Sequence, residues 1–396
     1  MTTAPQLAYD PYDYEIDADP FPVWKRMRDE APVYYNPQYD FFALSRFQDV
    51  LDASIDHQTF SSSRGTVLEL MDHPMADPPM IFMDPPRHTS FRKVVSKTFT
   101  LAQVGKLEAR IRELCSGYLD PLVGSGGFDY LVEFGAKLPV MVISSLLGVP
   151  EEDQEQLRVW TDLTLHREPG ETGASQAAKD ANADIFGYWM GQIQERRGRP
   201  RNDVMSQLMQ AELDFSDGRR PLTDGELYAF YLLISSAGNE TVARLLGSFA
   251  TLMAANPGER AKLVRDPSLI RNAVEETLRY ESPSPVQARW VMRDIEIHGQ
   301  SIPVDSKIAL LTASANRDER EFPDADRYDV ERTIDRHVGL GFGVHFCLGA
   351  SLARLESRVA FEETLKRFPT WDVDETGLRQ IHTSTVRGYC NVPITF

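Results

Sequence analysis

The chain has 396 residues, of which 42% are hydrophobic and 26% charged, a composition typical of a folded protein with a large core. Its formal net charge of −17 argues against nucleic acid or an anionic membrane surface as the main partner. Residues 1–19 lack the apolar segment of a signal peptide, and the longest apolar stretch elsewhere, 227–234, is too short to span a bilayer. The three cysteines, at positions 115, 347 and 390, form no disulfide framework. We therefore expect a cytoplasmic protein with one domain over residues 1–396, in which residues 1–18 form a loosely ordered tail.

The first part of the chain predicts a little β-structure followed by a long irregular segment. Residues 23–30 favour a helix, 33–35 and 41–44 a hairpin, and Ser45 the N-cap of the next helix. Residues 61–86 contain one glycine and five prolines, yet also many apolar side chains. Such a segment is typical of a functional or mobile loop, and it also fits a loop packed on the core, so the sequence leaves both interpretations open.

Helices dominate the middle of the chain. His88 and Arg92 lie four residues apart on one face of a helix expected to reach about residue 98, a spacing that fits either a surface pair or a binding pair. Further helices are expected over 101–122, 138–147, 151–166 and 175–196, with a mobile connection at 168–173 and a shorter helix after Asp203. The expected fold class is therefore mainly α with small β-sheets (α+β).

A long helix with polar residues at its centre follows. Thr223 and Glu226 form a capping box, and the pattern continues to residue 256, which makes a helix of about 50 Å. Gly238, Glu240 and Thr241 at its middle conflict with helix propensity and with burial, and such conflicts tend to mark function. Gly238 could leave room for a diatomic ligand, Thr241 could hydrogen-bond dioxygen or a water, and Glu240 could relay protons. The alternative is a Thr241 hydroxyl bonded to a helix carbonyl and a Glu240 carboxylate in a surface ion pair.

Beyond this helix, Asp266 and the proline after it should open another helix, on which Glu276 and Arg279 are three residues apart on one face. The Glu-x-x-Arg pattern is common by chance. Strands are expected over 286–297 and 301–311, and short strands over 370–396, with residues 385–387 as a turn into a pocket.

The segment 339–349 carries the strongest chemical signal. Glycines at 339, 341, 343 and 349 surround Cys347, so the backbone can press flat against a planar ligand. A helix that starts after Cys347 would point its first amides at the sulfur and favour the thiolate, which binds metals. No second Cys or His stands at zinc-site spacing, so a haem, which supplies the other ligands itself, is the better partner.

This segment resembles the haem-ligand loop of the cytochrome P450 family, Phe-Gly-x-Gly-x-His/Arg-x-Cys-x-Gly, although Leu340 replaces the leading phenylalanine. Residues 237–241 are similar to the family's Ala/Gly-Gly-x-Asp/Glu-Thr motif, and residues 316–332 to its meander. With the His88/Arg92 and Glu276/Arg279 pairs, five motifs occur in the family's order over essentially the whole chain. The resemblance implies the cytochrome P450 fold, with the long central helix crossing the distal face of haem b.

The same resemblance assigns roles to individual residues. The iron ligand is Cys347, and the other haem contacts are His88, Arg92, Arg289, His345, Gly341, Gly343 and Gly349. The residues implied for oxygen chemistry are Ala237, Gly238, Glu240 and Thr241. Those implied for a structural ion network are Glu276, Arg279 and Arg332. The substrate pocket is expected to contain Val67, Leu68, Met80, Phe82, Leu233, Val286, Gln287 and Val386.

The implied reaction is monooxygenation, in which one oxygen atom of O₂ enters a small apolar substrate, lipid-like or terpenoid. Electrons would come from a ferredoxin and its reductase, or from a flavodoxin, docked near Arg354 and Arg358, although both arginines also fit an ordinary solvated helix face. Two alternatives stay open at this point: a peroxide-driven peroxygenase, and a non-catalytic haem-thiolate sensor or carrier.

Overall fold

The computed structural model describes residues 7–73, 75, 77–165, 175–201, 203–215, 218–383 and 386–396. The expected connection at 168–173, residues 1–6 of the expected tail, and Thr385 of the expected turn lie outside this range. No helix within the described ranges is long and apolar enough to cross a lipid bilayer.

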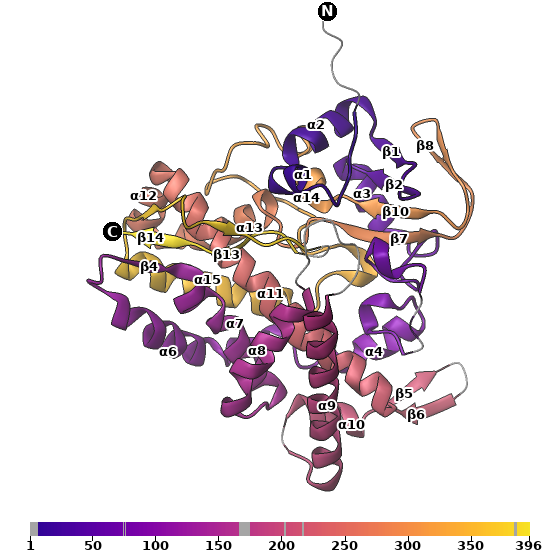
Figure 1. Ribbon diagram of the computed structural model, residues 1–396, viewed down its shortest axis with the longest axis horizontal. Coiled ribbons are helices and arrows are strands. Elements are labelled where there is room, and N and C mark those ends of the chain that lie inside the picture. The colour runs from indigo at the N-terminus through magenta and orange to yellow at the C-terminus, as the bar shows by residue number, and fades with distance from the viewer. Residues whose placement is uncertain are drawn as a thin grey trace, which may run out of the picture.

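Helices make up most of the described chain (Figure 1). The α-helices are α1 (Tyr14–Ala18), α2 (Phe21–Glu30), α3 (Phe47–Ile55), α4 (Arg87–Val95), α5 (Leu101–Gly105), α6 (Glu108–Leu119), α7 (Lys137–Leu147), α8 (Glu151–Leu165), α9 (Gln176–Gly198), α10 (Val204–Gln210), α11 (Asp224–Ala255), α12 (Pro257–Arg265), α13 (Ile270–Tyr280), α14 (Thr312–Ala315) and α15 (Ala350–Arg367). Short 3₁₀ or π turns are η1 (Leu68–Leu70), η2 (Met80–Phe82), η3 (Asp120–Leu122), η4 (Leu131–Gly135), η5 (Pro267–Leu269) and η6 (Gly343–His345).

The strands form five small sheets. A five-stranded sheet has the order β1 (Val33–Asn36), β2 (Phe41–Leu44), β10 (Lys307–Leu310), β7 (Gln287–Val291) and β3 (Phe60–Ser61). Only β2 and β10 run parallel within it. A three-stranded sheet joins β11 (Asp372–Val373), β14 (Pro393–Thr395) and β4 (Gly127–Asp129). Hairpins pair β5 (Glu212–Phe215) with β6 (Gly218–Pro221), β8 (Ile295–Ile297) with β9 (Gln300–Ile302), and β12 (Arg379–Gln380) with β13 (Tyr389–Asn391).

Helix α11 organises the core. Its capping box is present as expected, because the Thr223 hydroxyl accepts from the Glu226 amide and the Glu226 carboxylate accepts from the Thr223 amide. It runs through the centre of the molecule and packs against α7, α9 and α15 (Figure 1). The mainly α fold with small sheets predicted from the sequence is confirmed.

Two expectations about local structure were wrong. Residues 101–122 form α5, α6 and η3 instead of one helix; α5 ends at Gly105, and Pro121 lies in η3. Ser45 does not cap α3: Arg46 occupies that position, and the Ser45 hydroxyl donates to the Pro32 carbonyl.

The described part of the N-terminal tail is docked, which also differs from the expectation. Tyr9 is buried, and Asp13 caps the start of α1, where its carboxylate accepts from two backbone amides. Asp17 then binds the β12–β13 region, because its carboxylate pairs with His382 at 2.6 Å and its carbonyl accepts from Gln380 and Arg387. Residues 7–18 therefore form part of the folded protein.

Candidate active site

The Cys347 loop is shaped by two glycines in the left-handed region. Gly341 has φ +67° and Gly343 φ +66°, and the Cys347 amide donates to the Leu340 carbonyl at 2.8 Å, which closes the loop. A Cβ on Gly343 would lie 2.6 Å from the Ser54 carbonyl of α3, so this glycine also permits close packing. A Cβ on Gly349 would meet nothing within 4 Å, so the loop leaves open space on that side.

The protonation state of Cys347 is set by opposing effects. Burial raises the pKa of the thiol, while the Gly349 amide and the Arg92 and Arg354 guanidiniums lower it by less. The amide contribution expected from the start of the following helix is present, but desolvation outweighs it. A metal that binds the sulfur would displace the proton.

Two histidines and two arginines gather beside this loop. The rings of His88 and His345 lie 4.4 Å apart, and the His345 Nε2 atom is buried with no hydrogen-bond partner. Arg289 is also buried, and its guanidinium donates to the Ala288 carbonyl at 2.7 Å. Arg92 donates to the Val344 and Phe346 carbonyls at 3.2 and 2.6 Å, which ties α4 to the cysteine loop.

Burial disfavours the charged forms of these groups. It lowers the pKa of His88 to about 4, with Arg92 adding to the effect, and that of His345 to about 3, with Arg289 adding. Burial also lowers the pKa of Arg289 to about 10, and Asp84 only partly opposes it. Buried cations and an orphaned ring nitrogen are stabilised by carboxylates that hydrogen-bond to them. Since a haem carries two propionates, these residues fit that group.

Helix α11 presents its smallest side chains where the sequence predicted oxygen chemistry. Ala237 is exposed although it lies at the middle of a core helix, and Thr241, one turn later, is half-buried. The Thr241 hydroxyl donates to the Ala237 carbonyl at 2.8 Å, and the helix stays continuous here. This is the helix-carbonyl bond that the sequence left open as an alternative.

Gly238 faces another helix. A Cβ on this residue would lie 2.8 Å from Cγ1 and 3.1 Å from Cδ1 of Ile143, a buried residue of α7. The interpretation that Gly238 leaves room for a diatomic ligand is therefore not supported, since Ile143 occupies the space that the missing methyl provides. The opening on this helix is at Ala237.

Glu240 is paired within its own helix. Its carboxylate accepts from the Arg244 guanidinium at 2.5 Å, and both side chains are buried. Arg244 also donates to the Tyr389 carbonyl at 2.6 Å. Sequence analysis missed Arg244, although its i, i+4 spacing from Glu240 was a usable signal.

The predicted ion network is present. Arg279 donates to both carboxylate oxygens of Glu276 at 2.6 and 2.8 Å, and Arg332 donates to one of them at 3.2 Å. Arg279 further donates to the Asn316 and Ala325 carbonyls at 2.8 and 2.9 Å, which fastens α13 to the meander. A buried carboxylate with this many partners is a scaffold.

A second, unpredicted cluster lies beside it. Glu275 accepts from Arg354 of α15 at 2.7 and 2.8 Å, and from His337 at 3.0 Å when that ring nitrogen is protonated. Although burial opposes it, these partners hold the pKa of Glu275 at about 2. This cluster ties Arg354 to α13, next to the cysteine loop.

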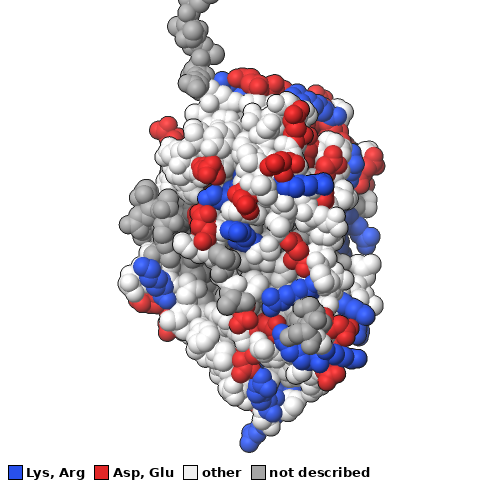
Figure 2. All heavy atoms as spheres, turned by 90° about the vertical axis from the view of Figure 1, so that its right-hand side faces the viewer, with Lys and Arg blue, Asp and Glu red and all other residues white. Residues whose placement is uncertain are grey.

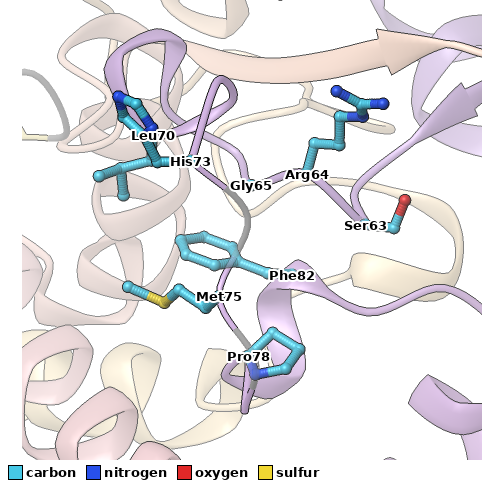
Figure 3. Close-up of a pocket in the computed structure, with 8 residues that line it drawn as sticks. All are labelled: Ser63, Arg64, Gly65, Leu70, His73, Met75, Pro78 and Phe82. Carbon is cyan, nitrogen blue, oxygen red and sulfur yellow. The ribbon is translucent and has the colours of Figure 1, made fainter.

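The expected substrate-pocket residues come from four regions. In the loop, Val67 and Leu68 are half-buried, Met80 is buried in the main core, and Phe82 lines a small hollow with Leu70 and Met75 (Figure 3). The hollow holds about one water molecule, so it is no substrate site itself. The remaining four are half-buried or buried: Leu233, Val286, Gln287 and Val386.

Comparison with known proteins resolves the family. The cytochrome P450 family model matches residues 170–387. The chain is 40% identical to cytochrome P450 123 of Mycobacterium tuberculosis over 395 residues, which is 99% of this chain and 97% of that protein. The chain is a cytochrome P450.

Other members of the family have names that state a substrate or a ligand. The vitamin D(3) 25-hydroxylase of Pseudonocardia autotrophica is 34% identical over 405 residues, covering 100% of this chain and 98% of that protein. The structure of CYP109E1 from Bacillus megaterium in complex with testosterone superposes with a TM-score of 0.85 at 29% identity, covering 96% of this chain and 98% of the other. As a cytochrome P450, the protein is a haem-dependent monooxygenase, and the cationic cluster and open loop described above fit the haem.

Proposed function

We propose that this cytochrome P450 inserts one oxygen atom of O₂ into an apolar, lipid-like substrate of the terpenoid or steroid type. The observation that carries the proposal is the centre of α11, where exposed Ala237 stands next to Thr241 and the buried acid Glu240. Reduction of O₂ consumes protons, and an acid beside an alcohol can supply them. A peroxygenase receives its oxygen already reduced and has no such need.

The chain's own residues hold the cofactor. Bound haem would supply the redox-active iron at which O₂ reacts, and Cys347 would hold that iron through its sulfur. Buried His88 and Arg289, together with His345, whose buried Nε2 atom has no hydrogen-bond partner, would anchor the propionates. Arg92 contributes by fixing the loop carbonyls beside the cysteine.

Two side chains of α11 handle protons. Thr241 holds a hydroxyl proton one helical turn from Ala237, and rotation away from the Ala237 carbonyl would turn it toward the exposed face. Glu240 exchanges protons with its surroundings, and its ion pair with Arg244 keeps the carboxylate oriented. Gly238 serves the packing of α7 and positions the segment.

The substrate class is supported by relatives and by the loop. One relative is named a vitamin D(3) hydroxylase and one structural neighbour was solved with testosterone, both ligands being apolar polycyclic or secosteroid molecules. In this chain the half-buried Val67, Leu68 and Phe82 supply apolar surface in the loop between α3 and α4. Leu233 adds apolar surface from α11.

We further propose that a ferredoxin or flavodoxin delivers electrons singly beside α15. Arg354 is the more suitable contact, with 38% of its side chain exposed beside its Glu275 partner. Arg358 is less suitable than the sequence indicated, because it is 16% exposed and paired with Glu108 and Glu362. A negatively charged partner would therefore meet Arg354 first.

The test is a screen of apolar molecules, read first as a spin-state shift of the ferric haem. Compounds that shift the spectrum are then incubated with NADH, a ferredoxin and its reductase under ¹⁸O₂. We expect a product with one ¹⁸O atom and NADH consumption matched to it. Product formed only with hydrogen peroxide would favour the peroxygenase, and tight binding without turnover under both conditions would favour a sensor or carrier.

A further inference from the structure

A second cavity lies behind helix α11. Its volume is about 380 Å³, within the usual range for small-molecule sites. It is bounded by the start of α7, by α8, by the centre of α11 and by the β12–β13 region. Neither the haem cluster nor the expected substrate residues take part in its lining.

The cavity and the exposed Ala237 lie on adjoining sides of the same helix. The α11 residues that line the cavity are Asn239, Glu240, Ala243 and Arg244. At about 100° per residue, their mean direction points roughly 110° away from the direction shared by Ala237 and Thr241, and Arg244 lies on the stripe next to Ala237. The cavity therefore adjoins the haem-facing side of the helix, but its lining contains none of the haem-contact or substrate-pocket residues expected from the sequence.

The lining is cationic although the protein is acidic. Among the described residues that line the cavity, Lys137, Arg158 and Arg244 stand against the carboxylate of Glu240, a net charge of +2 in a chain of net charge −17. His382 also borders it; its ring stacks on Tyr14 at 4.0 Å, and its Nδ1 atom pairs with the Asp17 carboxylate at 2.6 Å. On the outer surface, by contrast, basic and acidic side chains are interspersed on the face shown in Figure 2.

The cations at the opening are held by weak, exchangeable pairs. Lys137 pairs with Glu133 at 3.1 Å and is 36% exposed, and Arg158 pairs with Glu155 at 2.7 Å and is 25% exposed. Neither of these carboxylates lines the cavity. Partly exposed pairs between residues three or four apart contribute little to stability, so an incoming carboxylate can share the cations at low cost.

The floor and walls complete a site with apolar and polar parts. Asn239 and Arg244 are at least 94% buried at the floor, and each keeps one polar atom, Oδ1 and Nε, without a hydrogen-bond partner. Val132, Val140 and Ala243 supply apolar wall. We propose that this cavity is a second ligand site, selective for a small organic carboxylate with an apolar body, and formed by other residues than the substrate pocket expected beside the haem.

The test uses ferric holoprotein whose haem face is saturated with imidazole, so that the absorption spectrum reports any displacement there. 4-Phenylbutyrate is titrated by calorimetry, and 4-phenylbutyramide, its neutral analogue, in parallel. We expect 4-phenylbutyrate to bind without a spectral change and the amide at least about tenfold more weakly, since a charge-assisted hydrogen bond is lost. Raising the salt concentration should weaken the carboxylate more than the amide.

Arg158→Gln and Lys137→Gln should each weaken 4-phenylbutyrate roughly tenfold. The matched control is Arg110→Gln, which removes another exposed arginine paired at i, i+3, with Glu113, and which does not line the cavity. It should leave the affinity within about twofold. The proposal is overturned if 4-phenylbutyrate fails to bind, if it displaces imidazole, or if it binds no more tightly than the amide. It is also overturned if the two cavity variants bind 4-phenylbutyrate as tightly as the Arg110→Gln control does.

Discussion

The substitution Gly238→Ala tests whether this glycine is needed for α11 to pack against Ile143 of α7. In Gly238→Ala the new Cβ would lie 2.8 Å from Cγ1 of Ile143, well inside the usual 3.5–4.0 Å contact distance. Replacing glycine by alanine in a helix stabilises by about 1 kcal/mol, whereas overpacking a buried site costs about 1–3 kcal/mol. Since Ile143 is buried and cannot retreat into solvent, we expect a net loss of about 1 kcal/mol in the free energy of unfolding.

A second substitution reverses the sign. Ile143→Ala removes both atoms that the new methyl would meet, and costs about 2–5 kcal/mol on its own because it leaves a cavity. In that background Gly238→Ala should stabilise by about 1 kcal/mol, so the two changes couple by about 2 kcal/mol. Urea unfolding of the four holoproteins, followed by tryptophan fluorescence, gives the cycle.

The control substitution adds the same methyl group at a helical glycine that has no close neighbour. Gly191→Ala in α9, where a Cβ would meet nothing within 4 Å, should stabilise by up to about 1 kcal/mol. Additive effects of Gly238→Ala and Ile143→Ala would refute the packing argument. A Gly238→Ala variant of unchanged stability that loses affinity for carbon monoxide would instead restore the interpretation that this glycine makes room for a diatomic ligand.

Four further changes test the haem site and its support. Cys347→Ala should abolish the red-shifted Soret band of the reduced carbon monoxide complex, and a normal band in that variant would remove the ligand assignment. Thr241→Ala should divert NADH-derived electrons to hydrogen peroxide, measured as peroxide per NADH; unchanged coupling would leave the hydroxyl without a role in proton delivery. Glu275→Gln should lower the free energy of unfolding by up to about 3 kcal/mol above pH 5. The reason is that the pKa of Glu275 in the folded protein, about 2, lies below the ordinary glutamate value of 4.5. The difference in unfolding free energy between the variant and the unmodified protein should shrink as pH falls from 4.5 toward 2. A difference that does not change with pH would contradict the ion-pair explanation. Leu340→Phe should change the reduction potential of the iron. If the variant and the unmodified protein have the same potential, residue 340 has only a packing role.

The sequence predicted those features whose causes are local. The capping box at Thr223 and the Glu276–Arg279 pair depend on residues three apart on one helix, so spacing alone was enough. The glycines at 341 and 343 marked a loop that needs left-handed backbone, and the structure has it.

Features that depend on a second element were beyond the sequence. The neighbour of Gly238 is Ile143, almost a hundred residues earlier, and no spacing rule states which side of α11 meets α7. Burial of Cys347, which opposes the thiolate, depends on everything around the loop. The docking of residues 7–18 on the β12–β13 region likewise joins segments more than 350 residues apart, and the acidic, proline-bearing composition pointed the other way.

The pair of Glu240 and Arg244 has a consequence for how such an enzyme can diversify. Both charges belong to one turn of one helix, so their mutual orientation is inherited from the helical backbone and needs no loop to supply it. Segments that surround a substrate can then lengthen, shorten or exchange side chains while the orientation of the Glu240 carboxylate stays the same. In this protein, recognition of the substrate and orientation of the acid are therefore separable traits, free to vary independently of each other.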